Sequence, residues 1–250
     1  MTSLHVLSGN TCDFTTVCTP TINLDSTKEY EAALLSLDMY NSIPNIKSDD
    51  NNLFRYSPDN GITWKNIFLE TGSYELSHIN SEIQRQMIIN DDYNKEGYQF
   101  YIVISANVST LKSIINITNV SYQIDFTVAG SIGSLLGFTP AILKHGYNES
   151  HNIVNIMSVN SILVNVDIIS GSYVSGMQSS VLYSFYPNVP PGCKVVVHPN
   201  QLVYFPITRY NINRIRIWLT DQNLNPVDLR GETCTVAIVF KERLQVQLKN

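Results

Sequence analysis

Charged side chains are scarce in this chain. Asp, Glu, Lys and Arg make up 15% of its 250 residues, well below the roughly 25% that is usual for soluble proteins. A surface with so few charges must be covered by neutral polar side chains or be buried against partners. The net charge is −5 and no run of Lys and Arg occurs. We therefore expect no sequence-specific nucleic-acid binding and no wrapping of nucleic acid by phosphate neutralisation.

Long apolar runs are also missing. No segment approaches the ~20 consecutive apolar residues of a membrane-spanning helix. The first residues, Met1-Thr-Ser-Leu-His5, lack the basic start and the apolar stretch of a signal peptide. We therefore expect no transmembrane segment and an intracellular product.

Sequence motifs of catalytic and cofactor sites are absent. The chain has no Gly-x-Ser-x-Gly elbow, no phosphate-binding Gly-x-x-x-x-Gly-Lys loop, no His-Glu-x-x-His and no Cys-x-x-Cys. Its four cysteines, Cys12, Cys18, Cys193 and Cys234, do not have metal-ligand spacing. We expect them to be reduced thiols that act as small apolar core residues. The sequence thus predicts no catalytic residue, no cofactor, no metal site and no enzymatic activity.

What the sequence does contain is a series of short β-branched and aromatic runs. Pro, Gly, Asn or Asp separates them, which is the pattern of a β-sandwich or barrel. The expected strands are Asp13–Leu24, Tyr30–Tyr40, Asn52–Ser57, Thr63–Leu69, Tyr98–Ala106, Leu111–Ile117, Ser121–Val128, Val181–Tyr186, Cys193–His198, Gln201–Ile207, Ile212–Leu219 and Thr233–Phe240. The chain is therefore predicted to be all-β.

Two segments interrupt this pattern. Ile79, Ile83 and Met87 recur one helical turn apart, which predicts a helix near residues 77–88 with Ser77 as its N-cap. In its first turn, His78 is expected to face solvent. A second short helix is expected around Pro140, because proline is well tolerated at a helix start.

A polar stretch from Lys144 to Asn152 is expected to be a linker between two β-rich halves. Charge is unevenly divided between these halves. Residues 1–150 carry eight basic and sixteen acidic residues, and residues 151–250 carry eight basic and five acidic ones. One interpretation is that neighbouring copies meet positive to negative, which would favour association. The alternative is an uneven surface decoration without a role.

One segment has the pattern of an interface strand. In Asn213–Leu219 the alternation is strict, so that Ile215, Ile217 and Leu219 are expected on one face and Arg214, Arg216 and Trp218 on the other. Arginine and tryptophan are enriched in protein interfaces. We predict a subunit interface at Arg214, Arg216 and Trp218; the alternative is an ordinary exposed strand.

Several short phrases resemble a known family. They are Pro190-Pro-Gly-Cys-Lys194, Leu202-Val-Tyr-Phe-Pro206, Ile215-Arg-Ile-Trp-Leu-Thr-Asp-Gln222, Asp228-Leu-Arg-Gly-Glu232, Tyr40-Asn-Ser-Ile-Pro-Asn-Ile46 and Ser131-Ile-Gly-Ser-Leu-Leu-Gly-Phe138. On these the chain resembles the double jelly-roll major capsid proteins of small eukaryotic DNA viruses and Polinton-like elements.

The resemblance implies two tandem jelly-roll β-sandwiches, residues 1–148 and 149–250, with one or two short helices in the first. It also implies self-assembly as a homotrimeric, pseudo-hexagonal capsomer of an icosahedral shell, with penton or minor capsid proteins as partners. The location would be the virion, assembled in the cytoplasm or nucleus of the host cell.

Two alternatives stay open. At 250 residues the chain is short for two rolls, and a single jelly roll with a long insertion, as in a penton or vertex protein, is the competing arrangement. The other is a secreted β-sandwich carbohydrate-binding module with exposed aromatic side chains. Its Asn-x-Ser/Thr sequons would then carry glycans; they begin at Asn107, Asn116, Asn119 and Asn148.

Overall fold

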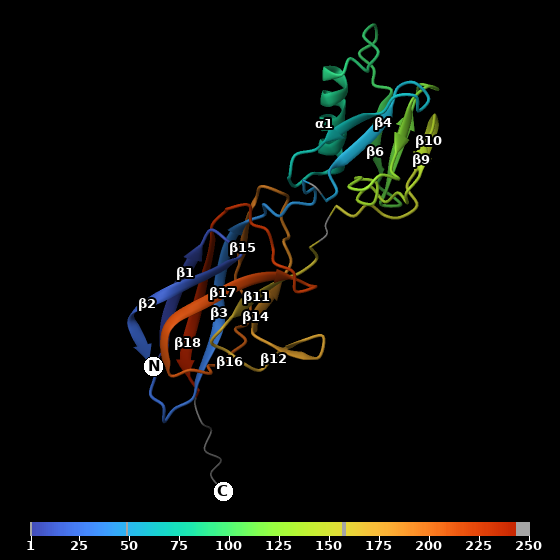
Figure 1. Ribbon diagram of the computed structural model, residues 1–250. Coiled ribbons are helices and arrows are strands. Elements are labelled where there is room, and N and C mark those ends of the chain that lie inside the picture. The colour runs from blue at the N-terminus through green and yellow to red at the C-terminus, as the bar shows by residue number, and fades with distance from the viewer. Residues whose placement is uncertain (1, 49, 157–158, 244–250) are drawn as a thin grey trace. The chain divides into compact units, whose positions relative to one another are not determined.

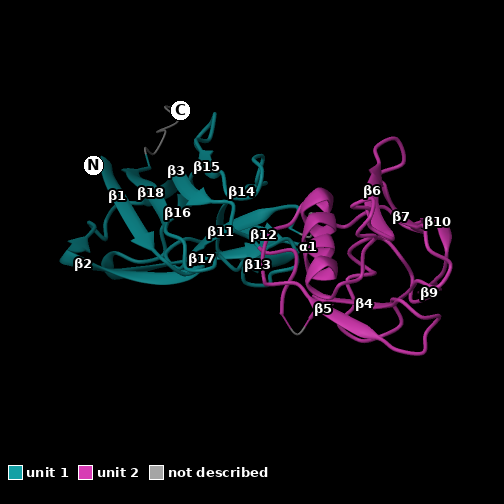
Figure 2. Cartoon of the chain, turned by 90° about the horizontal axis from the view of Figure 1, so that it is seen from above, with its two compact units in different colours: residues 1–43, 159–250 teal, residues 44–158 magenta. Residues whose placement is uncertain are grey.

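The structure is a computed structural model that describes residues 2–48, 50–156 and 159–243. The chain forms two compact units (Figure 2). Unit 1 consists of residues 1–43 and 159–250, and unit 2 consists of residues 44–158. Each unit has its own cluster of buried apolar side chains, and no described residue belongs to both clusters. Unit 2 is therefore an insertion into the sequence of unit 1.

Unit 1 contains two antiparallel sheets (Figure 1). The first sheet has the order β1 (Thr2–Gly9), β18 (Cys234–Glu242), β3 (Tyr30–Tyr40) and β15 (Lys194–Val197), with β16 (Phe205–Pro206) also paired to β3. The second has the order β14 (Val181–Phe185), β11 (Ile162–Val166), β17 (Asn211–Asp221) and β2 (Asp13–Asn23). A small hairpin, β12 (Ser172–Val174) and β13 (Met177–Ser179), lies outside these sheets.

The eight main strands of unit 1 pair in a nested order. In chain order they are β1, β2, β3, β11, β14, β15, β17 and β18. The first pairs with the last, the second with the seventh, the third with the sixth, and the fourth with the fifth. Eight antiparallel strands nested in this way over two sheets make up a jelly roll. Unit 2 is inserted between the third and fourth strands of the roll.

The core of unit 1 lies between its two sheets. Val236, Ile238 and Phe240 alternate along β18 and are at most 1% exposed. Ile215 and Ile217 are equally buried on β17 of the other sheet. In a strand every second side chain points to the same face, so each sheet contributes one apolar face to the sandwich and keeps the other face for solvent or partners.

Unit 2 combines two small antiparallel sheets with one helix. One sheet has the order β5 (Lys65–Phe68), β4 (Leu53–Ser57), β8 (Gln123–Asp125) and β9 (Ile142–Leu143). The other has the order β10 (Gly146–Glu149), β7 (Lys112–Ile117) and β6 (Ile102–Asn107). The helix, α1 (Leu76–Ile89), packs against β6 and buries the predicted stripe Ile79, Ile83 and Met87. The all-β prediction, with one helix, is thus confirmed for the described residues.

The N-cap of the helix lies two residues before the predicted cap. Glu75 is the N-cap and Ser77 lies within the first turn. The His78 amide donates to the Glu75 carbonyl oxygen at 3.0 Å, and the Glu75 amide donates to Nδ1 of His78 at 3.4 Å. His78 is exposed, as expected. It closes the helix start in the way that a capping box does.

The second predicted helix does not form. Residues 132–137 make an isolated turn, in which the Phe138 amide donates to the Gly133 carbonyl oxygen at 2.8 Å. Gly137 ends the turn with φ +83°, and a Cβ at this position would lie 2.3 Å from the Asn152 carbonyl oxygen. A left-handed residue so close to another backbone segment must be glycine, and it stops a right-handed helix from continuing.

The division into units differs from the expected halves 1–148 and 149–250. Residues 1–43 pair with strands near the C-terminus and not with the residues that follow them. The expected linker at Lys144–Asn152 contains β10, which pairs with β7 inside unit 2. In the described part of unit 2, β4, β6 and β8 each pair with the next strand along the chain, and the nested order of a jelly roll is absent there.

Candidate assembly surface

The predicted interface strand is β17, which lies inside the second sheet of unit 1. Its alternation is as expected: Ile215, Ile217 and Leu219 are at most 1% exposed, whereas Arg214, Arg216 and Trp218 lie on the opposite face. This face is the outer face of the sheet. The three side chains are therefore brought together where another molecule could reach them, and their interface role stays a prediction.

Arg216 is already bound within unit 1. Its guanidinium contacts both carboxylate oxygens of Asp13 on β2, with Nε 2.8 Å from Oδ1. It also lies over the ring of Trp218, 5.1 Å from the centroid, a cation–π contact. The hydrogen bond from Arg216 lowers the pKa of Asp13. Arg216 and Trp218 thus stabilise the outer face of their own sheet.

Arg214 differs from Arg216. In the ladder it lies opposite Val17 of β2, whose side chain is 72% exposed. Arg214 is exposed, and its guanidinium has no hydrogen-bond or ion-pair partner among the residues that the structure describes. Arg214 and Val17 are therefore the part of the predicted interface that is available to bind another molecule.

The first sheet of unit 1 carries an apolar outer face. The ladder places Leu4 beside Val239 and Val239 beside Ala33, and it places Val6 beside Ala237. Leu4 and Val6 are 58% and 59% exposed. Nearby on β3, Leu35 occupies a bulge and is 39% exposed. We call these residues, Leu4, Val6, Ala33, Leu35, Ala237 and Val239, the outer apolar face; its accessible part is formed by Leu4, Val6, Leu35 and the half-buried Val239, because Ala33 and Ala237 are buried. Contiguous apolar surface of this kind is typical of binding sites.

Ion pairs around the two sheets of unit 1 account for part of the uneven charge of the sequence. They join acidic residues of 1–43 to basic residues near the C-terminus: Asp13–Arg216, Glu29–Arg243, Glu31–Lys241, Glu31–Arg243 and Asp38–Lys194. Unit 1 holds nine basic and ten acidic residues and is almost neutral. The positive excess of residues 151–250 is therefore compensated within unit 1, whereas unit 2, with seven basic and eleven acidic residues, keeps a net negative charge. That copies meet positive to negative stays a prediction.

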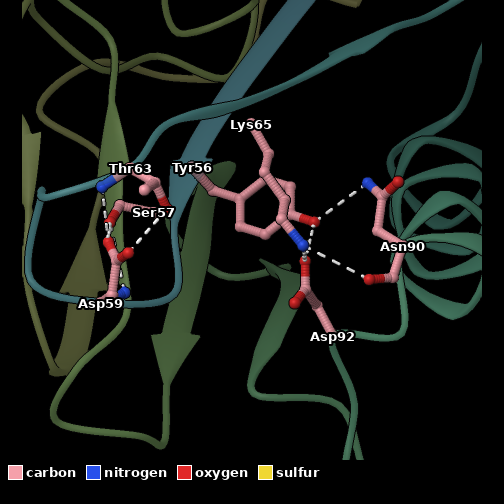
Figure 3. A network of polar contacts seen from close by, with 7 residues as sticks. All are labelled: Tyr56, Ser57, Asp59, Thr63, Lys65, Asn90 and Asp92. Carbon is pink, nitrogen blue, oxygen red and sulfur yellow. Dashed lines mark hydrogen bonds and ion pairs between the residues drawn. The ribbon is translucent and has the colours of Figure 1, made fainter.

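A polar network ties the helix of unit 2 to its sheet (Figure 3). Oδ2 of Asp92, just after α1, accepts hydrogen bonds from the Tyr56 hydroxyl on β4 at 2.5 Å and from Nζ of Lys65 on β5 at 2.7 Å. The side-chain amide nitrogen of Asn90 donates to the Tyr56 hydroxyl oxygen at 3.1 Å. Burial and Asp92 raise the pKa of Tyr56 well above its usual value. These groups satisfy one another, which is a structural arrangement.

The β4–β5 connection is held by a single carboxylate, also drawn in Figure 3. Asp59 accepts hydrogen bonds from the Ser57 hydroxyl, from the Thr63 amide at 2.8 Å and from the Thr63 hydroxyl at 2.6 Å. The bonds from Thr63 lower the pKa of Asp59 to about 2. A short polar side chain that bonds the backbone in this way is typical of a tight turn.

The cysteines divide into two groups. Cys234 is fully buried in β18, and Cys12 and Cys18 pack partly buried against the core of unit 1. Cys193 is exposed just before β15, so the prediction that all four are core residues is wrong for this one. Burial raises the pKa of the Cys234 thiol to about 12.

The described residues contain no cluster of three or more His, Cys, Asp or Glu side chains that could hold a metal ion. Their one α-helix is too short to cross a membrane.

Comparison with known proteins gives a match in structure only. No known protein family and no curated protein matches the sequence. The fold resembles that of a viral penton protein. The crystal structure of the selenomethionine-labelled mavirus penton protein matches with a TM-score of 0.51 and 11% identity, covering 97% of this chain and 100% of the other. The match therefore extends over both units. At this identity it is a likeness of fold, and the double jelly-roll type is not confirmed by it.

Proposed function

We propose that this protein is a structural capsid subunit that occupies the vertices of an icosahedral virion. The observation that carries this proposal is the jelly roll of unit 1, closed by strands from both ends of the chain and interrupted by one compact insertion. The mavirus penton protein has a similar fold over its whole length. Of the arrangements considered from the sequence, the single roll with a long insertion accounts for both units.

The trimeric capsomer is the less favoured arrangement. A double jelly roll requires a second set of nested strands, and the strands described in unit 2 pair mostly with their neighbours in the chain. A vertex subunit requires only one roll, with surfaces for its neighbours. For the binding-module alternative, two of the four sequon asparagines have side-chain nitrogens that are already hydrogen-bonded within the chain. The side-chain nitrogen of Asn148 donates to the carbonyl oxygens of Lys144 and Gly146 at 3.0 and 3.1 Å, and the corresponding nitrogen of Asn107 donates to Glu149.

A fivefold ring is closed by a head-to-tail interface, in which two different surfaces of each copy meet. Unit 1 offers two such surfaces. One is the outer apolar face of the first sheet, and the other is the outer face of β17 and β2 with Arg214 and Val17. One is apolar and the other carries Arg214, which has no partner among the described residues, so the two sides of the sandwich are not equivalent. Two different surfaces on each copy are what a head-to-tail ring requires.

The mass of the assembled protein tests the proposal. Size exclusion with light scattering, with negative-stain microscopy of the same peak, is expected to show a pentamer of about 141 kDa for a chain of 28.2 kDa. A trimer of about 85 kDa with a hexagonal outline would instead support the double jelly-roll capsomer. A monomer that stays monomeric at high concentration would contradict a capsid role.

A further inference from the structure

The strand β1 has a free edge that nothing in its sequence protects. β1 pairs along one side with β18, and no strand pairs with its other side in the described part of the chain. Its eight residues, Thr2–Gly9, include no charged residue and no proline. Proteins usually protect such edges with lysine, proline, bulges or a covering segment, because unpaired backbone groups recruit further strands. The edge of β1 is therefore suited to accept another strand.

The outer apolar face continues from this edge. Leu4 and Val6 are the outward apolar residues of β1, and the half-buried Val239 lies beside Leu4 in the ladder. Leu4 and Val6 lie two residues apart, so their side chains repeat at roughly 7 Å along the strand. A strand added at the edge would continue this surface if its own apolar residues alternated with the same period.

The last seven residues of the chain have this pattern. They read Leu244-Gln-Val-Gln-Leu-Lys-Asn250, with apolar residues at 244, 246 and 248 and glutamine between them. This period of two is the pattern of a strand with one apolar face. The free edge and the outer apolar face thus match a segment that the same chain contains.

The direction of β18 favours a neighbouring copy over the same copy. At the last described residue, the Arg243 amide donates to the Glu29 carbonyl oxygen at 2.9 Å, so the chain still runs in the direction of β18. Thr2 lies opposite Lys241, so Ala237 and Val239, the residues of β18 in the outer apolar face, come before the point at which the described chain ends. A return to the free edge of β1 in the same copy would have to pass over β1 itself, a distance of roughly 10 Å, which uses about three residues at ~3.3 Å each and takes Leu244 out of the added strand. In a neighbouring copy all three apolar residues are available.

We propose that the free edge of β1 and the outer apolar face bind residues 244–248 of a second copy of this chain, as an added strand. Backbone hydrogen bonds along β1 would supply affinity, and Leu244, Val246 and Leu248 would extend the apolar surface formed by Leu4 and Val6. The inference rests on the proposed function only in that copies assemble side by side. It names the element that links them.

Matched charge variants of the full chain test this inference. Leu244→Asp with Val246→Asp places two charges on the apolar side of the segment, and Gln245→Asp with Gln247→Asp places two charges on its other side. Because the first pair removes two apolar contacts, we expect the apparent dissociation constant between copies to rise by about a hundredfold or more. The control pair should keep the assembly. Equal effects of the two pairs would overturn the proposal.

Cross-linking identifies the contact directly. A photoreactive residue at position 246 of the full chain, in a mixture of 14N- and 15N-labelled protein, is expected to give intermolecular cross-links to residues 2–9. Cross-links within one copy, or to other strands, would overturn the inference. An oligomer of another size with cross-links to β1 would contradict the pentamer and leave the inference standing. A pentamer without cross-links to β1 would support the proposed function and overturn the inference. A monomer would contradict both.

Discussion

Tyr56 shows how one side chain holds unit 2 together. It is fully buried, its hydroxyl donates to Asp92, and it accepts from Asn90. In Tyr56→Phe the Asp92 carboxylate loses a donor and the side-chain amide of Asn90 loses an acceptor. We expect the free energy of unfolding to fall by about 1–3 kcal/mol, measured by urea denaturation.

A matched control for this change is Tyr147→Phe. Tyr147 is 66% exposed on β10, so loss of its hydroxyl should change the stability by less than about 0.5 kcal/mol. If the two variants had equal stability, the network would not contribute to the stability of unit 2.

The cysteines predict a difference in reactivity. The thiolate is the reactive form of cysteine, and burial raises the pKa of Cys234 to about 12. Cys193 is exposed. A thiol reagent such as DTNB should therefore modify Cys193 rapidly in the native protein and Cys234 only after unfolding. Peptide mapping of the labelled protein measures both, and early modification of Cys234 would show that β18 opens locally.

Asp59 predicts a pH dependence. Its pKa is lowered to about 2 in the folded protein from an ordinary value of 3.8. A lowered folded pKa means that the ionised carboxylate contributes stability above pH 3.8, and that this contribution is lost as the pH falls through about 2. The amide chemical shift of Thr63, which donates to Asp59, should titrate with a midpoint near 2. In Asp59→Asn this titration should disappear; a midpoint near 3.8 would contradict the turn geometry.

At the scale of the element, β17 separates stability from assembly. The Ile215 side of this strand builds the core, and Arg216 is bound to Asp13. Arg214 has no partner in the described part of the chain. Arg214→Glu should therefore leave the melting temperature nearly unchanged and weaken assembly by about tenfold or more, because a rim charge that meets a partner acts mainly on association.

The control for Arg214→Glu is Lys144→Glu, an equal charge reversal at an exposed position of unit 2. Light scattering over a dilution series compares the two variants. If both assemble like the unaltered protein, Arg214 lies outside the interface and the predicted role of the strand face is limited to stability.

The helix and the strands show what local patterns can predict. The apolar stripe of α1 was recognisable, because its spacing of one turn is local. The N-cap of the helix could not be recognised in this way, because the cap depends on a hydrogen bond from the Glu75 amide to the side chain of His78. The strand β11, Ile162–Val166, was missed because all five of its residues are buried. A strand covered on both faces has no alternation to recognise. β1 was missed because polar residues are mixed among its few apolar ones.

At the scale of the whole molecule, the two units make a prediction about fragments. Residues 44–158 are continuous in the sequence and have their own core. We expect this fragment to fold alone and to give a dispersed 1H–15N NMR spectrum. The fragment 1–148 contains β1, β2 and β3 without their partners β18, β17 and β15, and its first 43 residues should be unfolded. A spectrum with residues 1–43 folded would contradict the nested pairing.

Local chemistry determined the strand content, the faces of β17 and the position of the helix, because these follow from side chains two to four residues apart. The same local patterns made a tandem arrangement of two halves plausible. Only the tertiary structure decided that residues 1–43 close a sandwich with residues near the C-terminus and that residues 44–158 are an insertion. Strand pairing depends on contacts between residues far apart in the sequence, and any of several β-branched runs satisfies the local pattern of a partner equally well.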